Sequence, residues 1–301
     1  MATVLRRSVC PPNTSAIPII TTIQIIRTIH IIRKDPDMSV RDSLSVVQLT
    51  DLHLLADPEQ DFKGQKPWHN LVAVLEQSLK AHPVGLFLLT GDLSQDESVE
   101  SYQQLYQLMQ ETGVPWHWIP GNHDSVDLMQ ALHPIDFSVV SGEWQWLLLN
   151  SQSGQPHGEL DESQRRLLLQ ALEQPQALYQ AIAVHHQPLL VGPGRQGENH
   201  NPLMDNSETI AGIDSIPLRD QGWLWQTLTG FPAVKTVICG HVHQEQHLVK
   251  DQLSLLTTPA TSIQFASDIN EFQIADLAPG YRWLNLMPDG HVESRVYRLE
   301  N

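Results

Sequence analysis

Short apolar runs alternate with amphipathic stretches through the first half of the chain. The apolar runs predict strands buried on both faces, and the stretches with apolar residues at helical spacing predict helices between them. In chain order these are strand 45–50, helix 71–79, strand 84–90, helix 99–109 and strand 114–119. Gly113 follows the second helix as a typical helix stop. The β-α-β-α-β order predicts a largely parallel sheet and an α/β fold.

The same alternation continues further along and then changes character. The pattern predicts strand 146–150, helix 161–172, strand 181–184 and a last buried strand at 234–239. Beyond this point, turn residues at 278–280 and 288–290 indicate hairpins, so we expect the C-terminal part to be mostly antiparallel.

Residues 1–37 differ in composition from the rest of the chain. They are rich in Ile, Thr and Pro, with no helical period and no turn residues that would fold them back. We expect a poorly ordered extension, followed by a single domain over 38–301. An organelle presequence is less favoured, because β-branched residues are weak helix formers. A translation start at Met38 is a third interpretation.

Charge and composition limit the partners. The 301 residues carry a formal charge of −16; five of the 18 basic residues but only two of the 34 acidic ones lie in 1–37, which leaves −19 on the rest. Such a body repels a nucleic-acid backbone but accepts a small or metal-neutralised anion. No run of about 18 apolar residues predicts a membrane span. The two cysteines, Cys10 and Cys239, form no disulfide framework, so we expect a reducing, cytoplasmic location.

Polar clusters follow five of the predicted strands. These clusters are Asp51-Leu52-His53, Gly91-Asp92, Gly121-Asn122-His123-Asp124, His185-His186 and Gly240-His241-Val242-His243. The carboxyl ends of strands in an α/β sheet meet at one edge, so residues far apart in sequence come together there. Each cluster alone is explained by a helix cap, a turn or a surface histidine. Five in succession instead indicate a metal site, whose oxygen and imidazole donors suit Mn, Fe or Zn and are numerous enough for two ions.

The ordered set D-x-H, G-D, G-N-H-D, H and G-H-x-H resembles the signature of the calcineurin-like metallophosphoesterases. The chain is further similar to the bacterial class III 3′,5′-cyclic AMP phosphodiesterases within that family, in segments 48–53, 90–96, 120–124, 156–160, 239–245 and 278–282. The resemblance implies a four-layer α-β-β-α sandwich with mixed sheets and two divalent metal ions.

The resemblance also assigns roles to individual positions. It implies Asp51, His53 and His243 as ligands of one metal, Asn122, His185 and His241 as ligands of the other, and Asp92 as the bridge. Substrate contacts would come from His53, Asp92, Asn122, His123, His185 and His243. His186 follows a matched ligand, and we interpret it as a packed or supporting histidine.

The implied reaction is the hydrolysis of 3′,5′-cyclic AMP to 5′-AMP. The metals would activate a water and hold the phosphate, and His123 would protonate the leaving 3′-oxygen. Asp124 would orient that ring or cap the following helix. The segment 191–215 is long enough for a lid or for surface decoration.

Two other functions stay open at this point. A broad phosphodiesterase acting on 2′,3′-cyclic nucleotides or other small diesters is the main alternative. A non-catalytic scaffold of the same fold is disfavoured, because all seven ligand positions and His123 are present.

Overall fold

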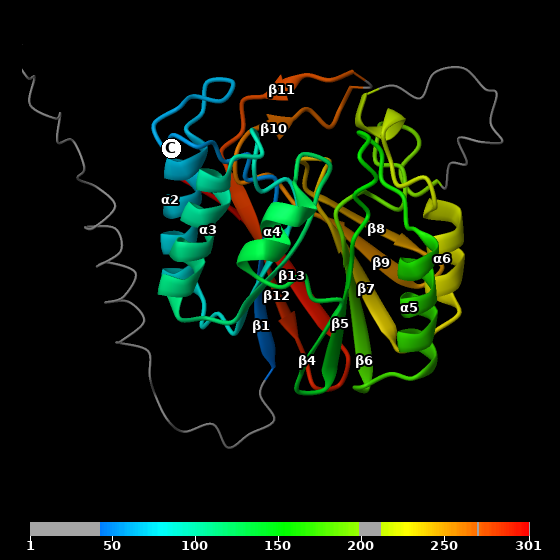
Figure 1. Cartoon of the computed structure of the whole chain (residues 1–301). Coiled ribbons are helices and arrows are strands. Elements are labelled where there is room, and N and C mark those ends of the chain that lie inside the picture. The colour runs from blue at the N-terminus through cyan, green and yellow to red at the C-terminus, as the bar shows by residue number, and fades with distance from the viewer. Residues whose placement is uncertain (1–42, 199–211, 270, 301) are drawn as a thin grey trace, which may run out of the picture.

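The computed structural model describes residues 43–198, 212–269 and 271–300 (Figure 1). Two β-sheets pack face to face, and helices cover the outer face of each. The predicted four-layer α-β-β-α sandwich with mixed sheets is therefore confirmed. The predicted extension at 1–37 lies outside the described residues, and the assignment of 38–301 to one domain stays a prediction. In the described part of the chain, no helix is long and apolar enough to cross a membrane.

The first sheet has five strands in the order β13-β12-β1-β2-β3. The bounds are β1 Leu44–Leu49, β2 Leu86–Thr90, β3 Trp116–Ile119, β12 Gly280–Leu286 and β13 Val292–Arg298. β1, β2 and β3 pair in parallel, as the β-α-β-α-β order predicts. β12 adds to β1 antiparallel and continues into β13 through the predicted turn at 288–290.

The second sheet has six strands in the order β4-β5-β6-β7-β9-β8. The bounds are β4 Ser138–Ser141, β5 Trp144–Leu149, β6 Tyr179–Val184, β7 Val234–Cys239, β8 Gln246–Lys250 and β9 Leu253–Thr257. β9 pairs in parallel with β7, although β8 and β9 form an antiparallel hairpin. The sheet is mixed for this reason.

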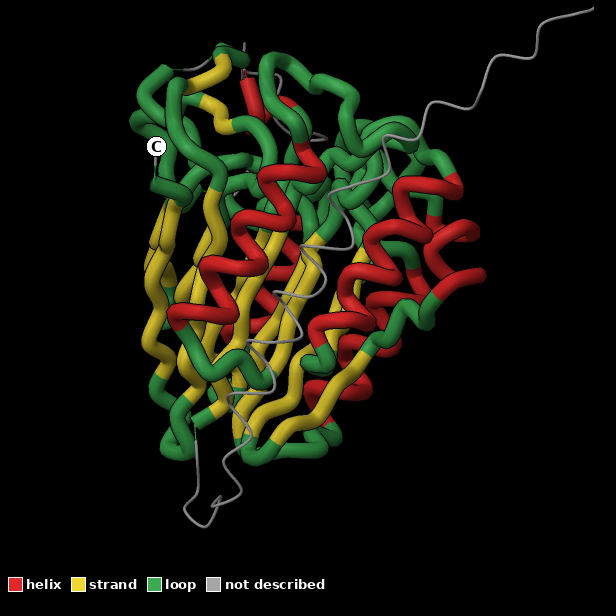
Figure 2. Tube along the Cα trace, turned by 90° about the vertical axis from the view of Figure 1, so that its left-hand side faces the viewer, coloured by secondary structure: helices red, strands yellow, loops and turns green. Residues whose placement is uncertain are grey.

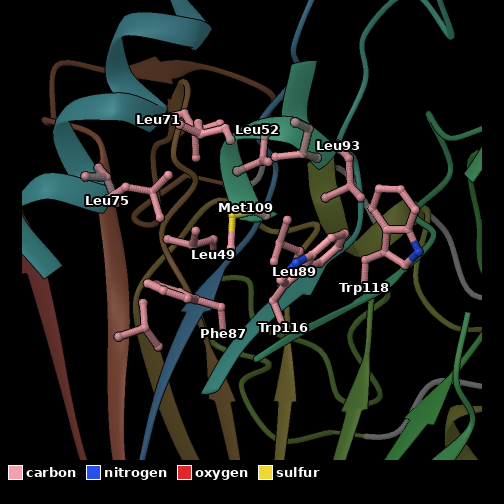
Figure 3. Packing of buried hydrophobic residues seen from close by; sticks show 14 of the residues in the cluster. Leu49, Leu52, Leu71, Leu75, Phe87, Leu89, Leu93, Met109, Trp116 and Trp118 are labelled. Carbon is pink, nitrogen blue, oxygen red and sulfur yellow. The ribbon is translucent and has the colours of Figure 1, made fainter. Parts of the chain in front are cut away.

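The helices bury one face each against a sheet. α2 (Pro67–Ala81), α3 (Val99–Thr112) and α4 (Val126–Leu132) contribute to the core over the first sheet, and α5 (Glu162–Glu173) and α6 (Gln221–Thr229) to the core over the second. Figure 3 shows the first of these cores, where Leu71 and Leu75 of α2 and Met109 of α3 lie over Leu49 and Phe87. Alternate residues of the inner strands, such as Val46 and Leu88, fill a third core between the sheets with Trp146.

Most predicted elements are found within one or two residues, and the exceptions have local causes. The sequence pattern does not predict α4, α6 or β4. α4 has only seven residues, α6 has an uneven apolar pattern, and β4 is only half-buried. The expected hairpin turn at 278–280 is wrong. Gly280 instead begins β12, which pairs with β1, while the preceding β11 (Ile274–Ala275) pairs with β10 (Gln264–Phe265).

Long loops gather at one end of both sheets, beyond the carboxyl ends of β1, β2, β6 and β7 (Figure 2). The short β10–β11 hairpin lies at the same end (Figure 1). All five polar clusters found in the sequence follow strands that end there. The fold therefore brings them to one edge, as the strand order requires.

Candidate metal centre

The polar clusters converge into three overlapping groups of potential metal ligands. The groups are Asp51, His53 and His243; Asp51, Asp92 and His185; and His185, His186 and His241. Within each group the donor atoms lie within 4.8 Å of one another, and every side chain is buried. Asp51 and His185 are each shared between two groups, so the three form one continuous centre.

Backbone conformation at this edge is unusual in a specific way. Asp51, His53, Asp92, His241 and His243 all have positive φ, between 49° and 66°. A positive φ is uncommon for non-glycine residues, is best tolerated by Asp, Asn and His, and collects at functional sites. In both the D-x-H and the H-x-H motif, the first and third residues have a positive φ. Their side chains therefore point toward the same centre.

Glycines let the loops approach closely enough to build it. A Cβ at Gly121 would meet Asp92 Oδ1 and the Asp92 backbone nitrogen, and one at Gly240 would meet Thr50 Oγ1. Gly91 combines the same crowding against His185 with a φ of +94°. The glycine in each motif is therefore needed for space, and at Gly91 also for backbone conformation.

The atoms around Asp51 form a set of facing acceptors. His53 Nδ1 pairs with Gln95 Oε1 at 2.8 Å, and His243 Nδ1 pairs with the Ile263 carbonyl at 2.7 Å. With Nδ1 of each ring donating outward, both Nε2 atoms carry lone pairs, yet they lie only 3.3 Å apart. Asp51 Oδ1 is a third acceptor, 3.2 Å from His243 Nε2. Such an arrangement is unfavourable unless a cation lies between the acceptors, so these residues fit a metal ion.

The atoms around His185 leave a similar opening. Its Nδ1 donates to the Thr90 carbonyl at 2.8 Å, and its Nε2 lies 3.3 Å from Asp92 Oδ1. Asn122 Oδ1 is buried and has no hydrogen-bond partner among the described residues. An orphaned amide oxygen is costly unless a cation or a water contacts it. This half of the centre therefore also fits a metal ion, with Asp92 facing both halves, since its Oδ2 lies 3.8 Å from His53 Nε2.

His186 belongs to the third group, but both of its ring nitrogens already have hydrogen-bond partners. Its Nδ1 pairs with Ser151 Oγ at 2.8 Å, and its Nε2 faces the Pro156 carbonyl at 3.3 Å. Its ring lies 4.5 Å from that of His241. These contacts support the interpretation of His186 as a supporting histidine, because a ring that uses both nitrogens has none left for a metal.

Electrostatics around the bridge favour an ionised carboxylate. Burial alone would raise the pKa of Asp92, but His185, His53 and His123 lower it well below its ordinary value. Burial would lower the pKa of His185, but Asp92 and Asp51 raise it to about 9. Burial lowers the pKa of His53 to about 4 and that of His241 to about 3. His53 and His241 therefore stay neutral beside an ionised Asp92, which is the protonation state that metal binding needs, whereas a metal bound by His185 would displace its proton.

Asp124 links the loops that follow β2 and β3. Its carboxylate accepts hydrogen bonds from the backbone of Leu93, Ser94 and Gly121, and from the hydroxyl of Tyr102 in α3. No hydrogen bond joins it to the His123 ring. The structure supports neither of the two roles expected for Asp124 as its main one. Its carboxylate instead joins the Gly-Asp loop to the Gly-Asn-His loop by hydrogen bonds. Burial raises its pKa to about 7.

A cleft of about 190 Å³ opens over the centre. His123 lines it, with its ring 5.2 Å from that of His53 and edge-on to it, and the His123 backbone nitrogen donates to Asp92 Oδ1 at 2.9 Å. Five of the six residues predicted to contact the substrate line the cleft: His53, Asp92, Asn122, His123 and His243. His185 lies beneath it, fully buried.

The segment 191–215, expected to be either a lid or surface decoration, is described only at its ends, since 199–211 lie outside the described residues. At the near end, Val191 and Gly192 donate backbone hydrogen bonds to Asp214. At the far end, Ile213 and Ile216 line the cleft.

Several residues of the site carry no motif that sequence reasoning could use. Phe62, Phe265 and Phe272 line the cleft, and Gln95 orients His53. Gln95 lies in segment 90–96, which carries the family resemblance, but no pattern in the sequence assigned it a role. The aromatic residues come from loops far apart in sequence, and only the fold brings them together.

The chain belongs to the calcineurin-like phosphoesterase family, whose profile matches residues 44–245. It is similar to the 3′,5′-cyclic adenosine monophosphate phosphodiesterase CpdA of Escherichia coli K12, with 34% identity over 84% of this chain and 89% of that protein. It is also similar to the 3′,5′-cyclic-nucleotide phosphodiesterase alr5338 of a Nostoc species, with 31% identity over 85% of this chain and 92% of that one.

A solved structure supports the fold independently. A dimetal phosphatase from Danio rerio superposes with a TM-score of 0.55 at 12% identity, over 85% of this chain and 99% of that one. The expected family is thus confirmed. The chain is a metallophosphoesterase with buried His and Asp clusters that fit a dimetal site.

Proposed function

We propose that the protein hydrolyses 3′,5′-cyclic AMP to 5′-AMP with two divalent metal ions bound at this centre. The observation that carries the proposal is the set of facing acceptors at Asp51, His53 and His243, joined through Asp92 to His185. The ring of His241 lies 5.1 Å from that of His185, and Asn122 Oδ1 is buried without a hydrogen-bond partner among the described residues. Relatives that carry cyclic nucleotide phosphodiesterase names along most of the chain support the choice of substrate.

The donor set favours iron or manganese, with zinc as a further candidate. Asp51, His53 and His243 would hold one ion, Asn122, His185 and His241 the other, and Asp92 both. Imidazole and carboxylate donors without thiolate suit these metals. When bound, the two ions would supply a nucleophilic hydroxide at neutral pH and neutralise charge on the phosphate. Cys239, the one cysteine in the described part of the chain, is buried and free, in keeping with a reducing cytoplasm.

The remaining work belongs to the side chains of the chain itself. Attack at phosphorus breaks the bond to O3′, and the leaving oxygen then needs a proton. His123 is the residue we assign to that step, because its ring lines the cleft beside His53 and its nitrogens make no hydrogen bond among the described residues. Histidine exchanges a proton near neutral pH, as a general acid must. The hydrogen bond from the His123 backbone nitrogen to Asp92 Oδ1 holds the main chain of His123 beside the bridge.

The second candidate is a broad phosphodiesterase that acts on 2′,3′-cyclic or linear diesters. The exposure of the cleft lining favours it, since Phe272, which lines the cleft, is 54% exposed. A non-catalytic scaffold is less well supported, because buried His and Asp side chains converge into groups that could hold metal ions.

The decisive experiment is a comparison of kcat/KM on several diesters with Mn-loaded protein. We expect 3′,5′-cyclic AMP to exceed 2′,3′-cyclic AMP and bis(4-nitrophenyl) phosphate by at least about tenfold, with 5′-AMP as the product. Equal values on all three would favour the broad phosphodiesterase, and the absence of turnover with two ions bound would favour the scaffold.

A further inference from the structure

The cleft has an aromatic wall that the metal chemistry does not use. Phe62 stacks on His53, with ring centroids 5.1 Å apart, and Phe265 stacks on His243 at 4.4 Å. Phe272 then packs edge-on against Phe265 at 5.6 Å. The first two rings therefore support proposed ligands, whereas Phe272 stacks on neither ligand ring and continues the wall from Phe265.

Backbone hydrogen bonds position the segments that carry these rings. Backbone hydrogen bonds in both directions between Phe62 and Gln65 close a tight turn. Phe265 pairs with Ile274 across the β10–β11 hairpin, and Ala266 donates to the Gln273 carbonyl, which fixes the place of Phe272 next to Phe265. In Figure 1 this hairpin lies over the same end of the molecule as the loop after β1.

Phe272 is left with an open ring surface over the cleft. It is 54% exposed, and it lines the cleft together with Ile213, Ile216 and Ile263. An exposed phenylalanine on its own needs no explanation. One that continues an apolar wall out of a metal centre offers a flat, apolar surface to a group attached to the phosphate.

Polar recognition on this wall is sparse. Outside the centre and His123, the described side chains lining the cleft include two polar ones, Lys63 and Gln95. Gln95 Oε1 already accepts from His53, and the ammonium of Lys63 can only donate. Selecting the 6-amino group of adenine requires an acceptor, whereas both purines offer acceptor atoms to a donor.

We infer that Phe272, backed by Phe265, forms a nucleobase subsite that binds a purine by stacking on its face. The inference rests on the proposed function for the identity of the ligand as a nucleotide. It goes further by naming the residue that holds the base and by predicting that adenine and guanine bind with similar affinity. Stacking tolerates any base, because every base has a π-face.

The test is calorimetric binding of 5′-AMP, 5′-GMP and ribose 5-phosphate to Mn-loaded protein. Ribose 5-phosphate keeps the sugar and phosphate and lacks the base. In the unchanged protein, we expect 5′-AMP and 5′-GMP to bind within about tenfold of each other and both more tightly than ribose 5-phosphate. Phe272→Ala should weaken 5′-AMP binding by about 5- to 100-fold, the usual worth of a base stack, and leave ribose 5-phosphate unchanged.

Two controls separate stacking from a general disturbance. Phe272→Tyr keeps the ring and should retain 5′-AMP binding. Leu277→Ala removes another exposed apolar side chain beyond the same hairpin, one that does not line the cleft, and should change neither ligand. Metal content of two ions in each variant verifies an intact centre.

The outcomes also separate this inference from the proposed function. Equal weakening of 5′-AMP and ribose 5-phosphate by Phe272→Ala, or no weakening of either, would overturn the subsite. A strong preference of the unchanged protein for 5′-AMP over 5′-GMP would overturn binding by the face alone. Failure of the unchanged protein to hydrolyse 3′,5′-cyclic AMP, with the Phe272 effect on 5′-AMP binding present, would refute the proposed function and leave the subsite standing.

Discussion

Asp92 faces both halves of the centre through its two carboxylate oxygens. Its Oδ1 lies 3.3 Å from His185 Nε2, and its Oδ2 lies 3.8 Å from His53 Nε2. The left-handed backbone at Asp92, with φ of 52°, directs the carboxylate into this place. A strained conformation is retained where the surrounding structure over-determines it, and here three histidines and the His123 amide do so.

The first prediction concerns this carboxylate. Asp92→Asn keeps the shape of the side chain but removes its negative charge, so we expect loss of at least one of two metal ions and a fall in kcat of more than about 100-fold. Metal analysis by atomic emission and steady-state kinetics measure both effects. His186→Ala is the comparison, since both nitrogens of His186 are engaged by Ser151 and Pro156. It should retain two ions, and near-normal metal content and rates in Asp92→Asn would show that the bridge is wrongly assigned.

The second prediction separates acid catalysis from metal binding at His123. His123→Ala should hold both ions, yet lose about 10²–10⁴-fold in kcat on 3′,5′-cyclic AMP, the usual worth of a positioned acid. A nitrophenolate leaving group needs little protonation, so the same variant should recover much of its rate on bis(4-nitrophenyl) phosphate. Equal losses on both substrates would instead indicate that His123 positions the phosphate.

At the scale of elements, the centre depends on close contacts between loops that follow β1, β2, β3 and β7. The Asp51 backbone nitrogen donates to the Gly91 carbonyl at 2.9 Å, and the His241 backbone nitrogen donates to Asp51 Oδ2 at 3.0 Å. Asp124 links the loops after β2 and β3 in the same way. Small residues at the crossing points make this possible.

The third prediction uses two glycines that differ in their surroundings. A Cβ at Gly121 would meet Asp92, whereas a Cβ at Gly222 in α6 would meet nothing within 4 Å. Gly121→Ala should lower the free energy of unfolding by about 1–3 kcal/mol through overpacking and reduce activity with it. Gly222→Ala should leave activity unchanged and raise stability by up to about 1 kcal/mol, as alanine does in a helix. Urea unfolding together with kcat measures both, and unchanged activity in Gly121→Ala would contradict the account of the loops.

The strands and the meeting of the ligands could be predicted from the sequence, whereas the contacts that support the ligands could not. β1, β2 and β7 could be predicted, because strands buried on both faces are continuous apolar runs ending in a polar motif. The convergence of strand ends predicted that the polar clusters meet at one edge, and the family resemblance implied that Asp51 and His243 share a metal; the structure brings them to 3.2 Å. The supporting contacts were not predictable, since the carbonyl of Ile263 and the side chain of Phe272 reach the site through loops whose course depends on the tertiary fold.

At the scale of the whole molecule, a buried polar network links the two sheets beneath the centre. Gln48 of β1 donates to the Cys239 carbonyl at the end of β7 and to Thr90 Oγ1 at the end of β2. Thr258 donates to Gln48 Oε1, and Arg282 of β12 donates to Thr258 Oγ1. Fully satisfied buried networks specify one arrangement. The register between the sheets, and so the distance between their ligands, is fixed here.

The fourth prediction is a pH dependence of the metal-free protein. Burial holds the pKa of His53 at about 4, that of His241 at about 3 and that of His186 well below its ordinary value. Unfolded histidines titrate at about 6.5, so the unfolded chain binds three more protons here between pH 6.5 and 4. Burial raises the pKa of Asp124 to about 7, which returns one proton to the folded state. Asp92 and Asp51 raise the pKa of His185 to about 9, so His185 is protonated in both states below pH 6.5 and adds nothing in this window.

The net uptake of about two protons on unfolding sets the sign. The free energy of unfolding should fall as the pH decreases through this window, by roughly 2.7 kcal/mol per pH unit at most. Urea unfolding of metal-stripped protein between pH 6.5 and 4.5 measures it. A flat profile, or a gain in stability on acidification, would contradict the assignment of neutral buried histidines.

The most direct test of the central claim is a metal titration of activity. Metal-stripped protein is titrated with Mn²⁺ while the hydrolysis of 3′,5′-cyclic AMP and the bound metal are followed together. We predict that little turnover accompanies the first equivalent, that activity rises with the second, and that 5′-AMP is the product. Full activity with one ion bound, or no turnover of 3′,5′-cyclic AMP with two, would contradict the claim that this centre is a two-metal cyclic nucleotide phosphodiesterase.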